Sequence, residues 1–340
     1  MKGLVVTRMY SRRQFLTAAT VAAAAAGLAA CGGAGAAGGG APTGATRTVK
    51  DIYGDDIVVP ADPQRIVALS EPALDGLLAL GITPVGCVAG RGQRTVAPYL
   101  PEEAREIELL GSVSQVNFEA VGAAKPDLIL VDGTSINNNQ PAIDALKVIA
   151  PVVYLGYAGG NWRTNFENLA AAVGKEQQAQ EIMAAYDEEV AAARGHLEKY
   201  SEDTFSIVRW EGNSAAMILQ DLPPGQALMD LGLRRPPAQD RMGRGHSEPV
   251  SNENLQDIDA DYMFFGTLGG SSISNPDAGG SVDIEAAEQA IASAVRVPGF
   301  TDLIAFQDGH IIPVDGALWT STGGPILMRR IVEDVNNNLE

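Results

Sequence analysis

The chain has 340 residues, of which 42 are acidic and 24 are lysine or arginine, so its net charge is −18 at pH 7. This acidic excess argues against a nucleic-acid partner, which would call for clustered positive charge, and favours a soluble protein that stays away from anionic lipid.

The first 31 residues predict an export signal that is not part of the fold. The sequence Ser-Arg-Arg-Gln-Phe-Leu at 11–16 is followed by a short alanine-rich apolar run. A basic start, a short apolar stretch and small residues are typical of a signal peptide, and the paired arginines resemble a twin-arginine signal. The ending Leu-Ala-Ala-Cys at 28–31 resembles a bacterial lipobox, after which Cys31 would carry lipid. Only Cys87 then remains, so no internal disulfide is expected.

Residues 32–46 consist almost entirely of glycine, alanine, proline and threonine, and they predict a flexible tether. Such a tether suits a protein that hangs from a membrane by its first residue. The alternative, a membrane span within the leader, is disfavoured because the apolar run is short and ends in Cys-Gly-Gly.

Residues 47–161 predict an α/β lobe. A hairpin around residues 53–56 comes first, and short apolar runs then alternate with helical segments. The predicted strands are 65–69, 84–87, 127–131 and 152–155, and the predicted helices are 72–80 and 141–149. Strands that alternate with helices favour a parallel sheet covered on both faces. Cys87, at a strand end, is expected to be a buried small hydrophobe.

A charged helix is predicted over residues 162–200, with apolar residues at helical spacing. Asn165 is its expected N-cap, and Gly174 and Gly195 allow it to be bent or interrupted. At 1.5 Å per residue such a helix is about 50 Å long, too long for a crossover between neighbouring strands. It therefore predicts a linker to a second α/β lobe, residues 201–340.

The chain repeats itself on either side of this helix. In each copy a glutamate, Glu119 or Glu253, stands eight residues before an aspartate, Asp127 or Asp261. That aspartate opens a four-residue apolar run, so each copy predicts a short helix followed by a buried strand. Two similar α/β lobes joined by one helix are the predicted architecture.

Several segments resemble the class III periplasmic binding proteins. Residues 63–69 (Pro-x-Arg-Ile-Val-x-Leu) and 79–86 (Ala-Leu-Gly-Ile-Thr-Pro-Val-Gly) are similar to the family's opening, and 298–300 and 310–315 to its last strand region. The resemblance runs from about 48 to 339. It implies two lobes with mostly parallel sheets flanked by helices and bridged by one long α-helix. It also implies a cleft that captures a ferric siderophore for an ABC importer.

Candidate ligand-binding residues lie beyond the carboxyl ends of the predicted strands, where loops can carry functional groups without disturbing the core. Arginine supplies charge and N–H donors to anionic oxygens, and aromatic rings cover apolar parts of a chelate. The resemblance assigns such positions to Arg94, Arg209 and Trp319. The strand ends add Arg91, Tyr157, Trp162 and Trp210. Packing inside the second lobe is the alternative for Trp210 and Trp319.

The resemblance also implies that Glu119 and Glu253 dock onto arginines of the membrane permease, one glutamate from each lobe. The alternative is that each is an acidic residue near a helix start, where the helix dipole favours it. The implied partners are a ferric siderophore, the permease dimer with its ATPase, and the membrane through lipidated Cys31. The chain is expected to be an extracytoplasmic, lipid-anchored monomer.

Other functions have less support in the sequence. No histidine, aspartate and glutamate cluster has metal-ligand spacing, so neither a bound metal ion nor a cofactor is expected. A haem or cobalamin carrier of the same family is the alternative, with Tyr157 or His246 as an axial ligand of haem. An exported hydrolase is less favoured, because Ser70 at a strand end lies outside any Gly-x-Ser-x-Gly elbow. The chain is therefore predicted to bind a ligand and not to be an enzyme.

Overall fold

The computed structural model describes residues 44–157, 160–243, 247–268 and 281–339. The predicted signal with Cys31, the tether up to residue 43 and His246 lie outside these ranges. The chain divides into two units, 1–37 and 38–340, and all described residues belong to the second. Within the described ranges, no helix combines the length and the apolar character that crossing a membrane requires.

The first half contains a six-stranded sheet with the strand order β6-β5-β4-β3-β7-β8. Its strands are β3 (Ile66–Ala68), β4 (Gly86–Ala89), β5 (Leu109–Ser112), β6 (Gln115–Val116), β7 (Leu128–Val131) and β8 (Val152–Tyr154). All neighbouring pairs are parallel except β5 with β6. Every residue of β7 is buried, as expected for a strand covered on both faces.

Helices cover both faces of this first sheet. They are α1 (Glu71–Ala79), α2 (Phe118–Ala123), α3 (Gln140–Ile149) and α4 (Trp162–Val173), with 3-10 turns η1 (Glu102–Glu106) and η2 (Ser135–Asn138). Buried residues of α1 and α4 pack on one face and those of α2 and α3 on the other. The strands β1 (Thr46–Lys50) and β2 (Asp56–Pro60) form the expected antiparallel hairpin.

The second half contains a five-stranded sheet with the order β11-β10-β9-β12-β13. Its strands are β9 (Phe205–Glu211), β10 (Ser214–Met217), β11 (Glu248–Val250), β12 (Tyr262–Gly266) and β13 (Ile311–Pro313). The strands β9, β12 and β13 pair in parallel, whereas β10 and β11 are antiparallel additions beside β9. The prediction of a second α/β layer is confirmed, but two of its four strand pairs are antiparallel.

In the second half, as in the first, helices alternate with the strands. They are α6 (Pro223–Asp230), α7 (Ile284–Ala294), α8 (Ile304–Gln307), α9 (Gly316–Trp319) and α10 (Pro325–Asn338), with 3-10 turns η4 (Asn252–Ile258) and η5 (Phe300–Asp302). The predicted repeat is present, since α2 precedes β7 and η4 precedes β12. The second copy is a 3-10 segment with a kink at Asn254, whose φ of −117° and ψ of 30° are not helical.

The predicted helix over residues 162–200 is interrupted. It consists of α4, then α5 (Glu176–Leu197), then a 3-10 turn η3 (Glu198–Tyr200). The break is at Gly174, whose φ of 70° lies in the left-handed region, as is typical of a glycine that ends a helix. Asn161, and not Asn165, is the N-cap of α4, since its side chain accepts two backbone N–H groups. Gly195 lies inside α5 and does not break it.

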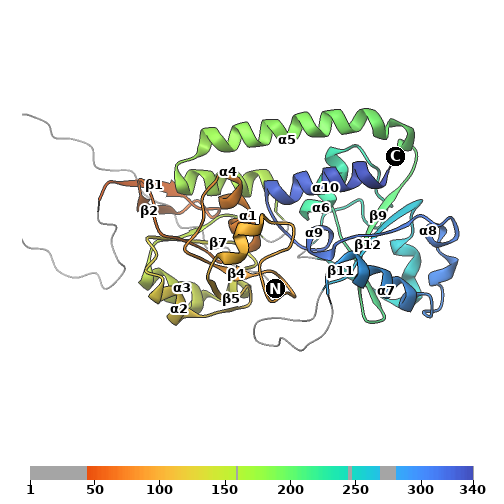
Figure 1. Ribbon diagram of the computed structural model, residues 1–340, viewed down its shortest axis with the longest axis horizontal. Coiled ribbons are helices and arrows are strands. Elements are labelled where there is room, and N and C mark those ends of the chain that lie inside the picture. Colours follow the sequence, from red (N-terminus) through yellow and green to blue (C-terminus); the bar gives the residue numbers. More distant parts are fainter. Residues whose placement is uncertain (1–43, 158–159, 244–246, 269–280, 340) are drawn as a thin grey trace, which may run out of the picture. The chain divides into compact units, whose positions relative to one another are not determined.

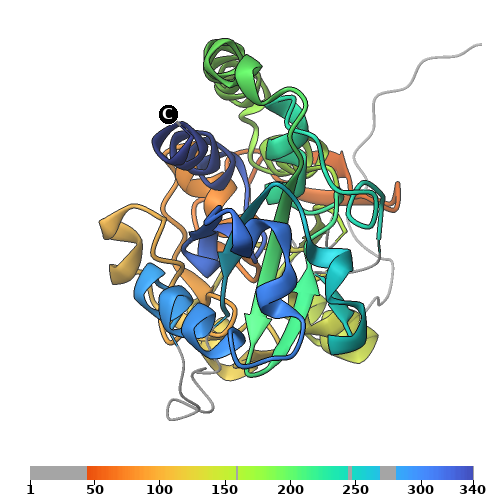
Figure 2. The same cartoon turned by 90° about the vertical axis from the view of Figure 1, so that its right-hand side faces the viewer.

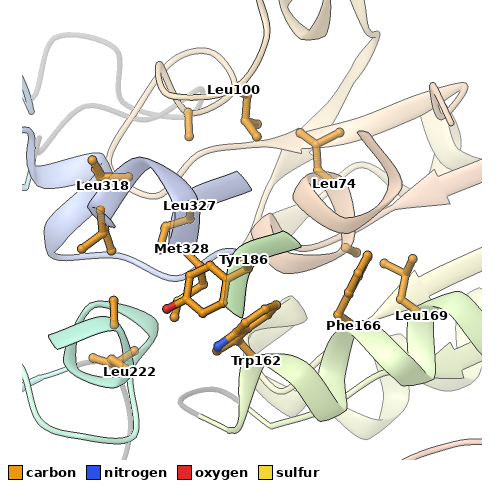
Figure 3. Packing of buried hydrophobic residues seen from close by; sticks show 14 of the residues in the cluster. Leu74, Leu100, Trp162, Phe166, Leu169, Tyr186, Leu222, Leu318, Leu327 and Met328 are labelled. Atoms are coloured by element: carbon orange, nitrogen blue, oxygen red, sulfur yellow. The ribbon is translucent and has the colours of Figure 1, made fainter. Parts of the chain in front are cut away.

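Helix α5 is the long helix of the prediction, and α10 lies alongside it (Figure 1). Helices α5 and α7 lie on opposite sides of the second sheet (Figure 2). One hydrophobic core includes buried residues from both halves, so the halves are joined by packing as well as by the chain. Figure 3 shows Leu74, Phe166 and Leu169 from the first half, Tyr186 of α5, and Leu222, Leu318, Leu327 and Met328 from the second.

The start of α10 is held by a carboxylate of α1. Asp75 is fully buried, and its oxygens accept the backbone N–H groups of Ile326 at 2.9 Å and Leu327 at 3.0 Å. The residue at the N-cap of α10, Gly324, has no side chain, so Asp75 supplies from a distant helix the cap that is missing locally. A Cβ at Gly324 would lie 2.8 Å from Asp75 Oδ1, so the close approach requires glycine.

We predict that Asp75→Ala destabilises the protein by about 2 kcal/mol, because two buried N–H groups lose their acceptor. The free energy of unfolding in urea measures this. The matched control is Asp144→Ala, which removes an exposed carboxylate of α3 that bonds only to Gln140 among the described residues, with an expected change within about 0.5 kcal/mol. Equal urea midpoints for Asp75→Ala and the wild type would contradict the proposed role.

Candidate functional site

The carboxyl ends of β4, β3, β7 and β8 form one edge of the first sheet, because these strands are parallel and adjacent. Ligands of such sheets bind beyond this edge. The residues that follow the strands here are Arg91 after β4, Glu71 after β3, Asp132 after β7 and Tyr157 after β8. This row of residues is the first side of the candidate site.

Glu71, the first residue of α1, holds Arg91. Its Oε1 accepts the backbone N–H of Arg91 at 2.8 Å, and its Oε2 lies 3.9 Å from Arg91 Nε. The hydroxyl of Ser321, just before α10, donates to the same Oε1 at 3.1 Å. Burial raises the pKa of the Glu71 carboxyl, and the charge of Arg91 opposes that rise. The carboxyl that positions Arg91 thus also contacts the last segment of the chain.

Arg209 brings a second guanidinium from the other sheet. It lies in β9 opposite Gly266, the last residue of β12, and is therefore near the carboxyl end of that sheet. Its Nε lies 3.2 Å from Glu211 Oε1. Burial lowers the pKa of the Arg209 guanidinium, Glu211 opposes this, and the charge of Arg91 lowers the pKa further. The two arginines, one from each sheet, are therefore close enough to repel each other.

Each of these arginines has a buried Nε–H that faces a carboxylate without forming a hydrogen bond: Arg91 faces Glu71, and Arg209 faces Glu211. Among the described residues, the Nε atoms of Arg91 and Arg209 make no hydrogen bond. Leaving a buried donor unpaired costs roughly 1–3 kcal/mol, and more for a charged group. Two like charges kept together, with buried donors that make no hydrogen bond, are unfavourable for stability alone. Such an arrangement is typical of a site that receives anionic oxygens.

Asp132 and Ser70 shape the loops at this edge. One oxygen of Asp132 accepts both the backbone N–H of Thr134, at 2.8 Å, and its hydroxyl, at 2.5 Å. Burial raises the pKa of the Asp132 carboxyl. The Ser70 hydroxyl accepts the backbone N–H of Ala73 and caps α1. Ser70 is fully buried and serves as a structural cap.

The tryptophans lie in the core, which corrects the prediction that they line a ligand site. Trp162, Trp210 and Trp319 are 2%, 1% and 0% exposed. Trp319 stacks on Phe264 with ring centroids 4.1 Å apart and donates its Nε1–H to Asp334 at 2.7 Å. Large apolar rings in the middle of a core contribute packing energy, and no surface of these three remains for a ligand.

The other predicted residues are at or near the surface. Arg94 is exposed in the loop after β4, close in sequence to Arg91, and Tyr157 is half exposed after β8. Glu119 and Glu253 are exposed in the first turns of α2 and η4. Arg94 and Tyr157 as ligand contacts, and the two glutamates as docking residues, stay predictions.

Asp132 lies where the strand ends predict site residues, whereas Glu71 and Ser321 complete the site and were not predicted. Glu71 lies two residues after a predicted strand and precedes Pro72, which was the available signal. Its contact with Ser321, 250 positions along the chain, has no local sequence signal. Among the described residues, no group of three or more histidine, cysteine, aspartate or glutamate side chains can hold a metal ion.

Two surface hollows lie elsewhere. One of about 490 Å³ is at the start of α7, and one of about 550 Å³ is beside α6. Neither is lined by Arg91 or Arg209. The candidate site is therefore identified by its two arginines, whose Nε donors make no hydrogen bond, and by its place at the strand ends, not by an enclosed cavity.

Residues 66–316 match the model of the periplasmic binding protein family. The chain belongs to this family. It is 30% identical over 295 residues to a probable siderophore-binding lipoprotein of Bacillus subtilis, with 85% of this chain and 86% of that protein covered. It is 24% identical over 293 residues to a petrobactin-binding protein of the same organism, with 83% and 84% covered.

Solved structures share the fold. Staphylococcus aureus SirA in complex with staphyloferrin B superposes with a TM-score of 0.72 at 22% identity, covering 86% of this chain and 98% of that one. A periplasmic binding protein of the FhuD fold family from Bacillus subtilis gives a TM-score of 0.66 at 25% identity, with 85% and 98% covered. The predicted family and the predicted two-lobed α/β fold are confirmed.

Proposed function

We propose that this chain captures a ferric siderophore outside the cytoplasm and delivers it to an ABC importer. The observation that carries the proposal is the pair Arg91 and Arg209, which come from different sheets and have buried Nε–H donors that make no hydrogen bond. The name of the relative that is 30% identical, a probable siderophore-binding lipoprotein, supports it. Within the described residues, no observation favours a haem or cobalamin carrier.

The chemistry of a ferric chelate suits this pair. The chelator fills the coordination shell of the iron, so the protein has to grip the outer face of the complex. Hydroxamate, catecholate and carboxylate oxygens carry negative charge, and a guanidinium binds them with a planar fork of N–H donors. Because Arg91 and Arg209 come from different halves, one ligand that contacts both holds the two halves together.

The proposed organisation places this binder at a membrane. Residues 1–31 form the signal, 32–46 the tether, 47–161 the first lobe, 162–200 the linker helices and 201–340 the second lobe. Lipidated Cys31 anchors the protein, which acts as a monomer. Glu119 and Glu253, one from each lobe, dock onto the permease, and their exposure in the first turns of α2 and η4 supports this.

We predict that Arg91→Met and Arg209→Met each weaken the binding of ferric chelates about 10- to 100-fold, since a charged hydrogen bond contributes about 1.5–3 kcal/mol. Isothermal titration of the mature, unlipidated protein with iron(III) trihydroxamate, triscatecholate and citrate complexes measures this. Thermal unfolding of each ligand-free variant checks that it folds, since the substitutions also remove the ion pairs with Glu71 and Glu211.

Arg105→Met is the control, because Arg105 is an exposed arginine paired with Glu102. Its expected affinity is that of the wild type. If no chelate gives a saturable signal with the wild type, the proposed function is wrong. If Arg105→Met weakens binding as much as Arg209→Met does, general electrostatic attraction and not the arginine pair is responsible.

We predict that Glu119→Ala with Glu253→Ala abolishes siderophore-dependent iron uptake and leaves chelate affinity within about twofold, since both residues are exposed and neither belongs to the ligand site. Uptake of radioactive iron by cells that depend on this protein, together with titration of the purified variant, tests both parts. Glu103→Ala with Glu288→Ala removes two other exposed charges and should keep full uptake. If cells with the Glu119→Ala, Glu253→Ala variant take up iron as fast as cells with the wild type, these glutamates do not dock onto the permease.

We predict that Cys31→Ala moves the protein from the membrane fraction to the soluble extracytoplasmic fraction, because no other anchor is proposed. Fractionation of cells followed by immunoblotting measures the distribution. Cys87→Ala is the matched control and should leave the protein with the membrane, because Cys87 is fully buried and burial raises the pKa of its thiol to about 12. Retention of Cys31→Ala in the membrane would contradict lipid anchoring at this residue.

A further inference from the structure

Two tyrosines stand exposed beside the candidate site. Tyr53, in the turn between β1 and β2, is 55% exposed, and Tyr157, after β8, is 50% exposed. Their ring centroids are 5.8 Å apart with an interplanar angle of 82°. Tyr154, at the end of β8, packs against Tyr53 with ring centroids 5.2 Å apart. Tyr53, Tyr154 and Tyr157 together form the tyrosine ledge.

Main-chain hydrogen bonds place the ledge on the same edge as the arginine pair. The backbone N–H of Gly133, next to Asp132, donates to Gly156 at 2.9 Å, and Tyr157 follows Gly156 directly. The backbone N–H of Ile52 donates to the carbonyl of Tyr154 at 2.9 Å. Burial and the charges of Tyr53 and Asp132 raise the pKa of Tyr154 to about 12, which agrees with this placement.

The ledge also lies toward the second half of the chain. The side-chain amide of Gln226, in α6, donates to the carbonyl of Gly160 at 3.1 Å. The backbone N–H of Trp162 donates back to the same amide at 3.3 Å. The segment that leaves Tyr157 is therefore in contact with α6. Gly160 in turn donates its backbone N–H to the carbonyl of Tyr157 at 3.0 Å, so Tyr157 lies one turn from this contact between the halves.

Tyr53 is held in place before any ligand arrives. The Asp51 carboxylate accepts the backbone N–H groups of Tyr53 at 2.9 Å and Asp55 at 3.0 Å. Gly54 adopts φ 84°, which lets the turn close without strain. A rigid turn presents the aromatic ring at little further cost in conformational entropy. Exposed aromatic rings that are fixed in this way are typical of binding surfaces.

We propose that the tyrosine ledge receives an aryl group of the chelate whose anionic oxygens face Arg91 and Arg209. Neighbouring strands are about 4.8 Å apart, and β8 is three strands from β4, so the edge from Arg91 to Tyr157 spans about 14 Å. A chelate with catecholate or phenolate arms carries negative oxygens that can bind Arg91 at one end of this edge. It also carries aromatic rings that can pack against Tyr157 at the other end. Aromatic rings stack on aromatic rings with a preference beyond the area that they bury.

The inference rests on the proposed function, and it is tested by comparing the affinities for an aromatic and an aliphatic chelate. The probes are the iron(III) complexes of a triscatecholate and of a trihydroxamate with aliphatic linkers, titrated calorimetrically. Tyr53→Ala with Tyr157→Ala should weaken triscatecholate binding about tenfold and trihydroxamate binding less than twofold. Tyr53→Phe with Tyr157→Phe should keep the affinity for both, because the rings remain.

The controls separate stacking from loss of structure. Tyr53→Leu with Tyr157→Leu keeps the apolar bulk and should weaken triscatecholate binding as the alanine pair does. Val148→Ala, an exposed residue of α3 that is 63% exposed, should change neither affinity. Thermal unfolding of each variant checks that it folds.

The inference is overturned if the alanine pair weakens both probes equally or neither of them, or if the wild type binds only the trihydroxamate. In each of these cases the wild type still binds a chelate, so the proposed function stands. If the wild type binds neither probe nor iron(III) citrate, the proposed function fails and the inference fails with it.

Discussion

The contact on which the rest of the structure depends is the grip of α1 on the start of α10. Glu71 and Asp75 are one helical turn apart on α1, and both are buried. Glu71 accepts a hydrogen bond from Ser321, and Asp75 caps the first turn of α10. The last helix of the second half is thereby fixed to the first helix of the first half. Buried residues of α1, of α10 and of both sheets belong to one hydrophobic core.

The same contact connects the fold to the site. Glu71 belongs both to the attachment of the last segment and to the positioning of Arg91. Arg91 and Arg209 keep two like charges near each other, with Nε donors that make no hydrogen bond, which is unfavourable for stability. The surrounding core has to provide the stability that this site does not. Functional sites commonly carry such a local cost inside an otherwise well-packed structure.

Local sequence patterns predicted the elements well and the long-range contacts poorly. Four buried apolar residues in a row marked β7, and the matched glutamates marked the repeated helix and strand. A break at Gly174 is compatible with the sequence because glycine often ends helices. The sequence does not determine that the helix breaks there and not at Gly195. The cap of α10 could not be predicted, since a helix usually finds its cap next to it and here the cap comes from Asp75. The tryptophans were misplaced because a residue near a strand end faces either the loop or the core, and proximity in sequence does not say which.

The position of α10 has a consequence for how the chain is made. It is synthesised after both sheets, and it completes a core that also contains α1 and α4 from the first half. The first half therefore cannot reach its final packing before α10 is made, although all of its strands are already present. Removal of α10 would take away part of the core of both halves at once.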